Sequence, residues 1–366
     1  MASENSPPRL WILASRHSGD NTQLDALADA LGWPCEVKRL AYKPYEEALR
    51  LAGLPTLASV DRAKSSPIAP PWPDIVLCAG RSTEAVAFWL RRNGNPKLRI
   101  VFVGTPWAPP SRFDLVITTP QYGLPEAPNI LHNTLPLHGV TPAKLEAEAK
   151  RWEERLAHLP KPRIAVLVGG GSGPYVFRPE AAARLGREAS RLASELSGSL
   201  LVTTSARTPK AAAEALAAAI TVPFFLHRWT KGGGDNPFHA FLGLTARIIV
   251  TADSISMLSE ASASGKPVSL FDIEDGCFSM RAEERMGVPP ASPKIAWRGG
   301  NFETTAFRFL MRHAPTRWSR DLRIVHRQAV DAGLASWLGE QPKPRATEPE
   351  DDLARAAARI RRLFGL

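Results

Sequence analysis

Residues 250–272, with the sequence VTADSISMLSEASASGKPVSLFD, constrain the fold of this chain more than any other stretch. Residues 247–251 form an apolar run that predicts a buried strand, and a helical pattern follows the polar turn at 252–254. Gly265 ends the helical pattern, and residues 267–271 predict the next buried strand. A strand, a helix and a second strand in this order predict a βαβ unit with parallel strands.

The turn of this unit has the composition of an anion site. Asp253 and Ser254 stand at the positions of helix N-caps, so the first free N–H groups of the helix would point out of the carboxyl end of the sheet. Phosphate is the anion that such a helix start binds most often. Glu260 shares a helix face with Ser256 and is placed to accept a hydrogen bond from a ribose hydroxyl. We therefore predict a site for a nucleoside diphosphate, with a polar turn that only caps its helix as the alternative.

The first part of the chain alternates predicted strands with predicted helices. Turns at residues 16–21 and 80–83 each follow a strand and open a helix. The predicted strands are residues 10–15, 35–40, 74–79, 100–103 and 115–118, and the predicted helices are residues 22–31, 44–52 and 84–92. This alternation predicts a parallel, doubly wound sheet whose functional turns lie at the edge where the strands end.

A second start of the same pattern at residue 163 indicates a second domain. An apolar run at residues 163–168 leads into the glycine-rich turn GGGSG, and strands then alternate with helices again. Residues 120–142, rich in Pro and Asn, suit a passage between the two domains. We expect an N-terminal Rossmann-like domain at residues 1–145, a C-terminal Rossmann-like domain at 160–300, and a helical extension at 301–366 that partly crosses back to the first domain.

Length and composition are those of a globular protein with two domains. The chain has 366 residues, of which 44% are hydrophobic and 22% charged, and these values exclude a disordered protein. No apolar run reaches the ~18 residues of a membrane span, and the N-terminus lacks the basic start of a signal peptide, so we expect a cytoplasmic protein. Cys35, Cys78 and Cys277 match no metal-binding spacing, and we expect reduced, structural thiols.

An excess of positive charge favours anionic partners. Lys and Arg number 46 against 36 Asp and Glu, which gives a formal net charge of +10. The basic residues are scattered and form no nucleic-acid-binding motif, so nucleic acid is not an expected partner. The last helix combines basic and apolar residues, which predicts either peripheral contact with the anionic inner face of the cytoplasmic membrane or packing of this helix on the fold. Its residues are Arg355, Arg359, Arg361 and Arg362 with Leu353, Ile360, Leu363 and Phe364.

Three polar turns of the second domain are expected to meet at the carboxyl edge of its sheet. They are GGGSG at residues 169–173, SART at 205–208 and ADSIS at 252–256. Glycine lets backbone N–H groups approach a phosphate, and Arg207 carries a forked set of donors that would neutralise it. GGGSG is neither a P-loop nor a strict dinucleotide fingerprint, so turns that are merely tight are the alternative.

The turn after the first predicted strand carries groups for acid–base chemistry. His17 or Asp20 would deprotonate an acceptor hydroxyl, and Asn21 and Gln23 offer hydrogen-bond donors. We expect these side chains to face the second domain across a cleft. A solvated histidine and a simple helix cap are the alternative interpretations.

Several of these motifs together resemble one known family. They are GD-x-x-Q at residues 19–23, AGR-x-S/T at 79–83, GGGS at 169–172, TTS-x-RTP at 203–209, NPF at 236–238 and TADS-x-SM-x-SEA-x-x-x-GKPV at 251–268. The sequence is similar to the family known by the plant mitochondrial fission factor ELM1 and its bacterial relatives. This similarity covers nearly the whole chain up to about residue 272, and its last motif is the most specific. Without a mitochondrial-type transit peptide, the chain looks like a bacterial member.

The resemblance implies a GT-B fold, in which two Rossmann-like domains face each other across a cleft and the C-terminal domain binds the nucleotide-sugar. Matched to the family, the donor is held by Gly170, Gly171, Ser172, Arg207, Asp253, Ser254, Ser256 and Glu260, to which we add Ser205 and Asn236. The acceptor-side turn contains Gly19, Asp20 and Gln23, to which we add His17, Asn21 and Arg81. One departure is Ala206, which stands where the resemblance implies a second basic residue beside Arg207.

We therefore predict an inverting, metal-independent glycosyltransferase that takes a sugar from a nucleoside-diphosphate sugar to a glycan or lipid-linked acceptor at the membrane. No Asp-x-Asp motif is present to hold a metal, and we expect no cofactor beyond the nucleotide-sugar substrate. The helix start after Asp253, the glycine amides and Arg207 would stabilise the leaving diphosphate, and Asp20 or His17 would be the base. The alternatives are a nucleoside-diphosphate-sugar epimerase with the same donor site and a non-catalytic scaffold at a membrane.

Overall fold

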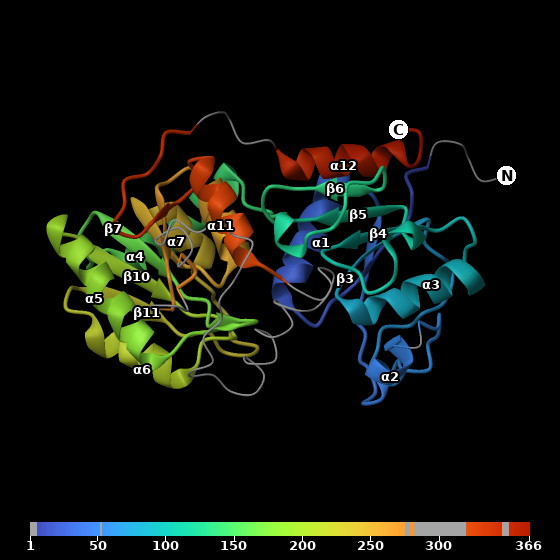
Figure 1. Cartoon of the computed structure of the whole chain (residues 1–366), viewed down its shortest axis with the longest axis horizontal. Coiled ribbons are helices and arrows are strands. Elements are labelled where there is room, and N and C mark those ends of the chain that lie inside the picture. Colours follow the sequence, from blue (N-terminus) through green and yellow to red (C-terminus); the bar gives the residue numbers. More distant parts are fainter. Residues whose placement is uncertain (1–5, 52, 275–278, 282–319, 346–350) are drawn as a thin grey trace. The chain divides into compact units, whose positions relative to one another are not determined.

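The computed structural model describes residues 6–51, 53–274, 279–281, 320–345 and 351–366. The chain forms two compact α/β units (Figure 1). Unit 1 consists of Met1–Gly139 and Pro349–Leu366, and unit 2 consists of Val140–Glu348. The division falls at Gly139, so the helix α4 (Pro142–Leu156) belongs to unit 2. Cys277 and the first part of the predicted helical extension, residues 301–319, lie outside the described residues.

Unit 1 is built on six parallel strands in the order β2-β1-β3-β4-β5-β6. They are β1 (Leu10–Leu13), β2 (Cys35–Lys38), β3 (Ile75–Ala79), β4 (Arg99–Val103), β5 (Leu115–Thr118) and β6 (Ile130–His132). The first five confirm the predicted strands. β6 lies inside residues 120–142, for which the sequence predicts a passage between domains. This strand is only three residues long and pairs with β5 alone, so it leaves no alternating pattern in the sequence.

The inner strands β1, β3, β4 and β5 are buried on both faces because helices cover the sheet on each side, whereas three of the four residues of the edge strand β2 are exposed. The helices are α1 (Ser18–Leu31), α2 (Glu46–Leu51), α3 (Glu84–Asn93) and α12 (Asp352–Arg362). Leu10 and Ile12 of β1 pack with α1 and α12 in one core cluster. Trp11 and Leu13 point to the opposite face and pack with α3 in a second cluster. This two-sided burial explains why the inner strands appear in the sequence as continuous apolar runs.

The first helix starts earlier than predicted. α1 begins at Ser18, whereas the apolar periodicity begins at residue 22, and His17 occupies the N-cap position. The polar segment at residues 18–21 is therefore a helical turn and not a loop. Its Gly and Asn residues have low helix propensity, which favoured a turn in the sequence, but hydrogen bonds from Asn21 to the backbone of Ser15 fix this part of the chain.

The last helix packs its apolar face on α1 within unit 1 (Figure 1). Ala356 and Ile360 are fully buried there. Two of its arginines donate to backbone carbonyls of unit 1: Arg355 to the end of β6 (2.7 Å) and Arg361 to the end of α1 (2.7 Å). Packing on the fold is thus confirmed, and this apolar face is not free for a membrane. Nowhere in the described ranges is there a helix with the length and hydropathy to cross a bilayer.

Unit 2 contains a second six-stranded parallel sheet, in the order β11-β10-β7-β12-β13-β14, and a short antiparallel hairpin of β8 and β9. The strands are β7 (Arg163–Leu167), β8 (Gly171–Ser172), β9 (Tyr175–Val176), β10 (Ser199–Thr203), β11 (Phe224–His227), β12 (Arg247–Thr251), β13 (Val268–Phe271) and β14 (Ser336–Trp337). β12 matches the predicted strand at residues 247–251 residue for residue. The prediction of two Rossmann-like, doubly wound parallel sheets is confirmed, and β14 is an unpredicted addition beside β13.

The helices of unit 2 are α4, α5 (Pro179–Glu195), α6 (Lys210–Ala219), α7 (Phe238–Leu244), α8 (Ile255–Ala263) and α11 (Leu322–Asp331). α5 packs on α6, and a Cβ added to Gly186 would lie 2.8 Å from the carbonyl oxygen of Leu216.

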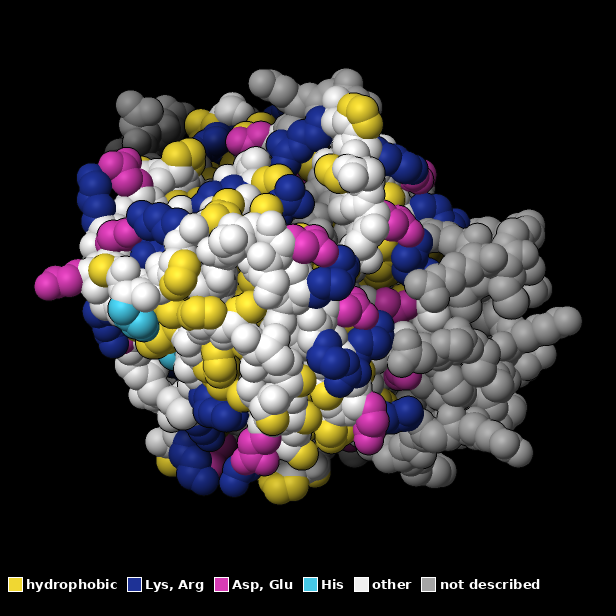
Figure 2. All heavy atoms as spheres, turned by 90° about the vertical axis from the view of Figure 1, so that its left-hand side faces the viewer, with side chains coloured by type: hydrophobic (Ala, Val, Ile, Leu, Met, Phe, Trp, Pro, Cys, Tyr) yellow, Lys and Arg dark blue, Asp and Glu magenta, His cyan; other side chains and the backbone are white. Residues whose placement is uncertain are grey.

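On the face drawn in Figure 2, the coloured Lys and Arg side chains are interleaved with Asp and Glu. That face therefore presents mixed charge instead of one basic field.

Replacing Ile360 with Ala should destabilise unit 1, because it leaves a cavity between α12 and α1. Ile360 is fully buried, and truncation of such a side chain costs about 2–4 kcal/mol. Arg362→Ala, at an exposed position of the same helix, is the control and should change the free energy of unfolding by less than about 0.5 kcal/mol. Urea unfolding measures both variants, and an unchanged stability of Ile360→Ala would contradict the docking of α12.

Candidate functional site

The strand order of unit 2 reverses between β7 and β12. β10 and β11 lie on the far side of β7, whereas β13 and β14 lie beyond β12. In open α/β sheets, ligands bind outside the carboxyl ends of the strands at such a reversal. GGGSG follows β7 and ADSIS follows β12, so the reversal places two of the three predicted turns next to each other.

The carboxylate of Asp253 joins these turns. Its Oδ2 accepts the N–H groups of Gly170 (3.0 Å) and Gly171 (3.1 Å), and Nη1 of Arg207 lies 3.1 Å away. The side chain of Asp253 is fully buried, so the protein itself must supply the hydrogen bonds that water would give. Only glycine fits here, because a Cβ on Gly170 would lie 2.1 Å from the carbonyl oxygen of Arg207. The predicted convergence of GGGSG, SART and ADSIS is confirmed.

Side chains of neighbouring turns hold the glycine turn from both sides. The N–H of Gly169 donates to Oγ1 of Thr251 (2.7 Å), and the hydroxyls of Ser205 and Thr208 donate to the carbonyl of Gly169. The N–H groups of all three leading glycines, which we had assigned to a phosphate, thus have acceptors within the protein. In this structure, Asp253 and Ser205 anchor the turn.

The start of α8 remains as the anion-binding element of this edge. Ser254 stands at the N-cap position, as predicted, but its side chain makes no capping hydrogen bond. The N–H groups of residues 255–257 have no acceptor within the helix, and their partial positive charge attracts an anion. Arg207 is half-exposed and contacts Asp253, the residue before the N-cap, so its guanidinium lies next to this helix start.

Glu260 lies further along α8 and faces α7. Its Oε1 is 3.9 Å from Nε2 of His239. Burial raises the pKa of Glu260 from 4.5 to about 7, although Lys144 acts in the opposite direction. Burial, and after it Lys144, lowers the pKa of His239 to about 4. Because the folded-state pKa of Glu260 lies above its ordinary value, the ionisation of this residue costs stability as the pH rises from about 4.5 to about 7.

Two other residues of the predicted donor set have partners within unit 2. Oδ1 of Asn236 accepts the N–H of Phe238 (3.1 Å) at the exposed start of α7. The hydroxyl of Ser172, in the β8–β9 hairpin, accepts a hydrogen bond from Nη1 of Arg320 (3.3 Å). The structure thus brings the glycine turn, Arg207 and the start of α8 together, while Asn236 bonds to the start of a different helix, α7.

A buried histidine supports the ADSIS turn and was missed in the sequence. Nε2 of His326, in α11, lies 2.6 Å from the carbonyl oxygen of Ala252, 74 residues away. Burial lowers the pKa of His326 to about 4, so the neutral ring donates its Nε2–H to that carbonyl at neutral pH. A histidine on the apolar face of an amphipathic helix was the only signal in the sequence, and it is as typical of a core residue as of a site.

Unit 1 has its own strand reversal, between β1 and β3. The order β2-β1-β3 places the turn after β1 beside the turn after β3. Oδ2 of Asp20 accepts the hydroxyl of Ser15 (2.7 Å). A Cβ on Gly80 would lie 2.8 Å from that hydroxyl oxygen and 3.6 Å from Oδ2 of Asp20. Asp20, Ser15 and the start of the second turn therefore form one cluster at this edge.

Asn21 and Gln23 hold the backbone of unit 1. Oδ1 of Asn21 accepts the N–H of Ser15 (2.7 Å), and its Nδ2 donates to the carbonyl of the same residue (3.0 Å). Oε1 of Gln23 accepts the N–H of Leu137 (3.2 Å). Asn21 therefore fixes the first turn of α1 against the end of β1, and Gln23 ties α1 to the segment that follows β6.

The remaining acceptor-side residues lie around this first turn and the neighbouring one. Gly19 and the half-buried Asp20 belong to the first turn of α1, and His17 is exposed at its N-cap. The guanidinium of Arg81 lies over the ring of Trp107, 5.5 Å from its centroid. Asp20 and His17 are therefore the two candidate bases at this edge of unit 1.

Comparison with known sequences gives one family and two curated relatives. The model of the family described as Mitochondrial fission ELM1 matches residues 18–285. The mitochondrial fission protein ELM1 of Arabidopsis thaliana is 28% identical over 250 residues, which are 59% of this chain and 54% of that protein. The uncharacterized protein RP120 of Rickettsia prowazekii is 24% identical over 301 residues, 72% of this chain and 82% of that protein. The chain thus spans about half the length of the Arabidopsis relative.

Solved structures with similar folds are remote in sequence. UDP-GlcNAc 2-epimerase from Neisseria meningitidis, bound to UDP-GlcNAc, has 12% identity and a TM-score of 0.46, with 97% of this chain and 99% of that chain covered. A glycosyltransferase from Rickettsia africae has 10% identity and a TM-score of 0.45, with 99% of each chain covered. Likenesses at this level do not identify an activity.

Asp253→Ala should destabilise unit 2, because it leaves the N–H groups of Gly170 and Gly171 without their acceptor. Each such buried group costs about 1–3 kcal/mol, so we expect a loss of about 2–4 kcal/mol in the free energy of unfolding. Asp235→Ala removes an exposed carboxylate that pairs with two arginines, and this control should cost less than about 1 kcal/mol. Urea unfolding compares them, and equal losses would contradict the anchoring role of Asp253.

Proposed function

The chain belongs to the mitochondrial fission ELM1 family, and from this membership and the geometry of unit 2 we propose that it is a glycosyltransferase of GT-B type. Its donor would be a nucleoside-diphosphate sugar bound at the carboxyl edge of unit 2. One observation carries the proposal: the helix start of α8 lies at the strand reversal, next to Arg207, without a side-chain cap.

The diphosphate would bind to the N–H groups of residues 255–257 and to Arg207. These groups would stabilise the negative charge that grows on the leaving diphosphate, which is the task that a metal ion performs in other transferases. The hydroxyls of Ser254 and Ser256 lie at the same helix start. Asp253 would act as a positioning residue, because it holds the glycine turn and contacts the guanidinium of Arg207.

Glu260 would accept a hydrogen bond from a ribose hydroxyl. A carboxylate is a stronger acceptor than a carboxylic acid, so the ionised form makes the stronger bond. The pKa of about 7 in the free protein means that ligand binding and ionisation are coupled near neutral pH. We therefore expect nucleotide affinity to fall as the pH drops below 7.

Sugar transfer would need a base on the acceptor side, and Asp20 is our first candidate, with His17 as the second. The base would take the proton of the acceptor hydroxyl as the acceptor oxygen bonds to the anomeric carbon of the sugar. The bond between that carbon and the diphosphate oxygen would break, and the nucleoside diphosphate would leave. An attack from the face opposite the leaving group inverts the configuration. We place the acceptor, a glycan or a lipid-linked molecule, at the inner face of the cytoplasmic membrane.

A non-catalytic scaffold is the second candidate, because the Arabidopsis relative carries the name of a mitochondrial fission protein. A scaffold could retain the fold without binding a nucleotide. An epimerase would bind the same donor but would transfer no sugar to an acceptor. Nucleotide binding, followed by an assay for transferred sugar and released diphosphate, separates the three.

Calorimetry with uridine, guanosine, adenosine and cytidine diphosphates tests the donor site. At least one of them should bind the wild-type protein, and it should bind about tenfold more weakly at pH 6 than at pH 8. The reason is that Glu260, with a pKa of about 7, is mostly protonated at pH 6. Failure of all four nucleotides to bind would favour the scaffold.

The terminal phosphate of a nucleoside diphosphate also titrates near neutral pH, and the variant Glu260→Gln separates the contribution of Glu260 from it. It should bind the nucleotide more weakly than the wild type at pH 8 and lose the part of the pH dependence that Glu260 contributes. Glu214→Gln, an exposed change on α6, is the control and should behave like the wild type. A pH profile of Glu260→Gln identical to that of the wild type would remove Glu260 from the site.

Asp20→Asn should lower the rate of sugar transfer by about 100-fold or more, because a general base contributes a factor of this size. The affinity for the nucleotide should stay the same, since the change lies in unit 1. Asp29→Asn, an exposed change on the same helix, is the control and should leave the rate unchanged. Normal turnover of Asp20→Asn would leave His17 as the base.

A further inference from the structure

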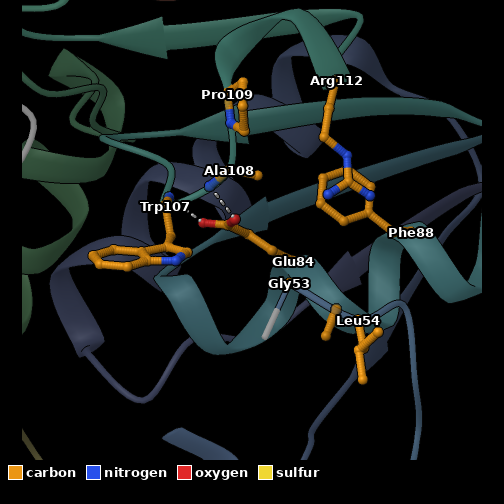
Figure 3. Close-up of a pocket in the computed structure, with 9 residues that line it drawn as sticks. Gly53, Leu54, Glu84, Phe88, Trp107, Ala108, Pro109 and Arg112 are labelled. Carbon is orange, nitrogen blue, oxygen red and sulfur yellow. Dashed lines mark hydrogen bonds between the residues drawn. The ribbon is translucent and has the colours of Figure 1, made fainter. Parts of the chain in front are cut away.

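A half-open pocket lies in unit 1 between the start of α3 and the segment that follows β4 (Figure 3). Its cavity volume is about 140 Å³. Most of its wall is apolar, from Leu54, Ala85, Phe88, Trp107, Ala108 and Pro109. Leu54 is 51% exposed, although leucine is the kind of side chain that folding normally covers. This wall offers a small apolar group a place out of water.

Glu84 is the carboxylate in the wall of the pocket, and backbone N–H groups donate hydrogen bonds to both of its oxygens. Oε1 of Glu84 accepts the N–H of Trp107 (2.6 Å), and its Oε2 accepts the N–H of Ala108 (2.9 Å); both bonds are drawn in Figure 3. Glu84 also lies in the first turn of α3, where the helix dipole stabilises a negative charge. Glu84 therefore ties the segment after β4 to α3, and its charge is compensated within the wall.

Arg112 is the cation in the wall of the pocket. In the described part of the chain, no carboxylate pairs with it. The guanidinium of Arg112 stacks on the ring of Phe88, 3.8 Å from its centroid (Figure 3). Asp114, two residues away, pairs instead with Arg91 and Arg99. Arg112 is exposed, so its planar fork of N–H donors at the rim can bind an anion.

Size and charge together define the ligand. An apolar cavity of about 150 Å³ accommodates one benzene ring, so this pocket takes a single ring or a short piece of an aliphatic chain. An anionic group attached to that piece would meet Arg112 at the rim. The pocket is too small to bind the apolar face of an amphipathic helix from a partner protein.

We propose that this pocket binds a small amphiphile, with its apolar end against Phe88 and Leu54 and its anionic head group on Arg112. The same segment of chain, residues 80–84, connects the pocket to Asp20: Gly80 touches the Asp20 cluster, and Glu84 lines the pocket. Residues 80–84 thus link the pocket along the chain to the candidate base of unit 1. The identity of the amphiphile as the acceptor for sugar transfer rests on the proposed function, whereas its binding does not.

Calorimetry with octyl phosphate below its micelle concentration tests the pocket in the full chain. Octyl phosphate should bind at one site. Inorganic phosphate lacks the apolar chain and octyl glucoside lacks the anionic group, so each should bind at least tenfold more weakly. Arg112→Gln should weaken octyl phosphate at least tenfold, since it removes a charge-assisted hydrogen bond. Ala85→Leu, which fills the cavity with a good helix former, should have the same effect.

Arg92→Gln is the matched control for Arg112→Gln, because Arg92 is an exposed arginine on α3, the helix that carries Ala85 and Phe88. This variant should bind octyl phosphate like the wild type, and circular dichroism should show all three variants folded. Equal affinity of the wild type and Ala85→Leu for octyl phosphate would overturn the proposal. Octyl glucoside that binds as tightly as octyl phosphate would also overturn it. Tight binding of inorganic phosphate alone would identify a simple anion site and also overturn the proposal.

The outcome is independent of the donor site in unit 2. Binding of octyl phosphate that depends on Arg112 and Ala85, without any nucleotide binding, would support the pocket and reject the glycosyltransferase. Nucleotide binding without octyl phosphate binding would support the donor site and reject the pocket.

Discussion

The carboxyl edge of the sheet in unit 2 depends on one buried carboxylate, that of Asp253. A charge that has lost its water needs donors from the protein, and Asp253 obtains them from the N–H groups of Gly170 and Gly171 and from Arg207. Because no Cβ fits at Gly170, glycine is what allows the backbone to come this close. The glycine turn, Arg207 and the start of α8 are therefore one connected structure, and a change in one of them would move the others.

Unit 1 uses the same physical device in two places. The amide of Asn21 binds both backbone groups of Ser15, and the carboxylate of Glu84 accepts two N–H groups from the segment after β4. In each case a polar side chain fixes the segment that leaves a strand at the carboxyl edge of the sheet. Loops held in this way can present a ligand-binding group without losing order, which is what Asp20 and Arg112 would require.

The strands with long apolar runs were predictable because burial on both faces leaves a continuous pattern. The central strand β12 was predicted to the residue, whereas the short edge strands β6 and β14 were missed. An edge strand of two or three residues is stabilised by pairing with a distant neighbour, and such pairing leaves no local signal. The start of α1 was missed for a related reason, since hydrogen bonds between Asn21 and Ser15 override weak helix propensity there.

The sequence by itself determined that two parallel sheets form and that three polar turns of the second meet at one edge, because apolar runs, helix ends and turn residues act locally. Only the tertiary structure decided which partner each polar group takes. The first glycine N–H groups, assigned from the sequence to a phosphate, bind Thr251 and Asp253, and the uncapped start of α8 is left for an anion. Strand order and hydrogen-bond partners depend on residues that are far apart in the chain, and no local pattern records them.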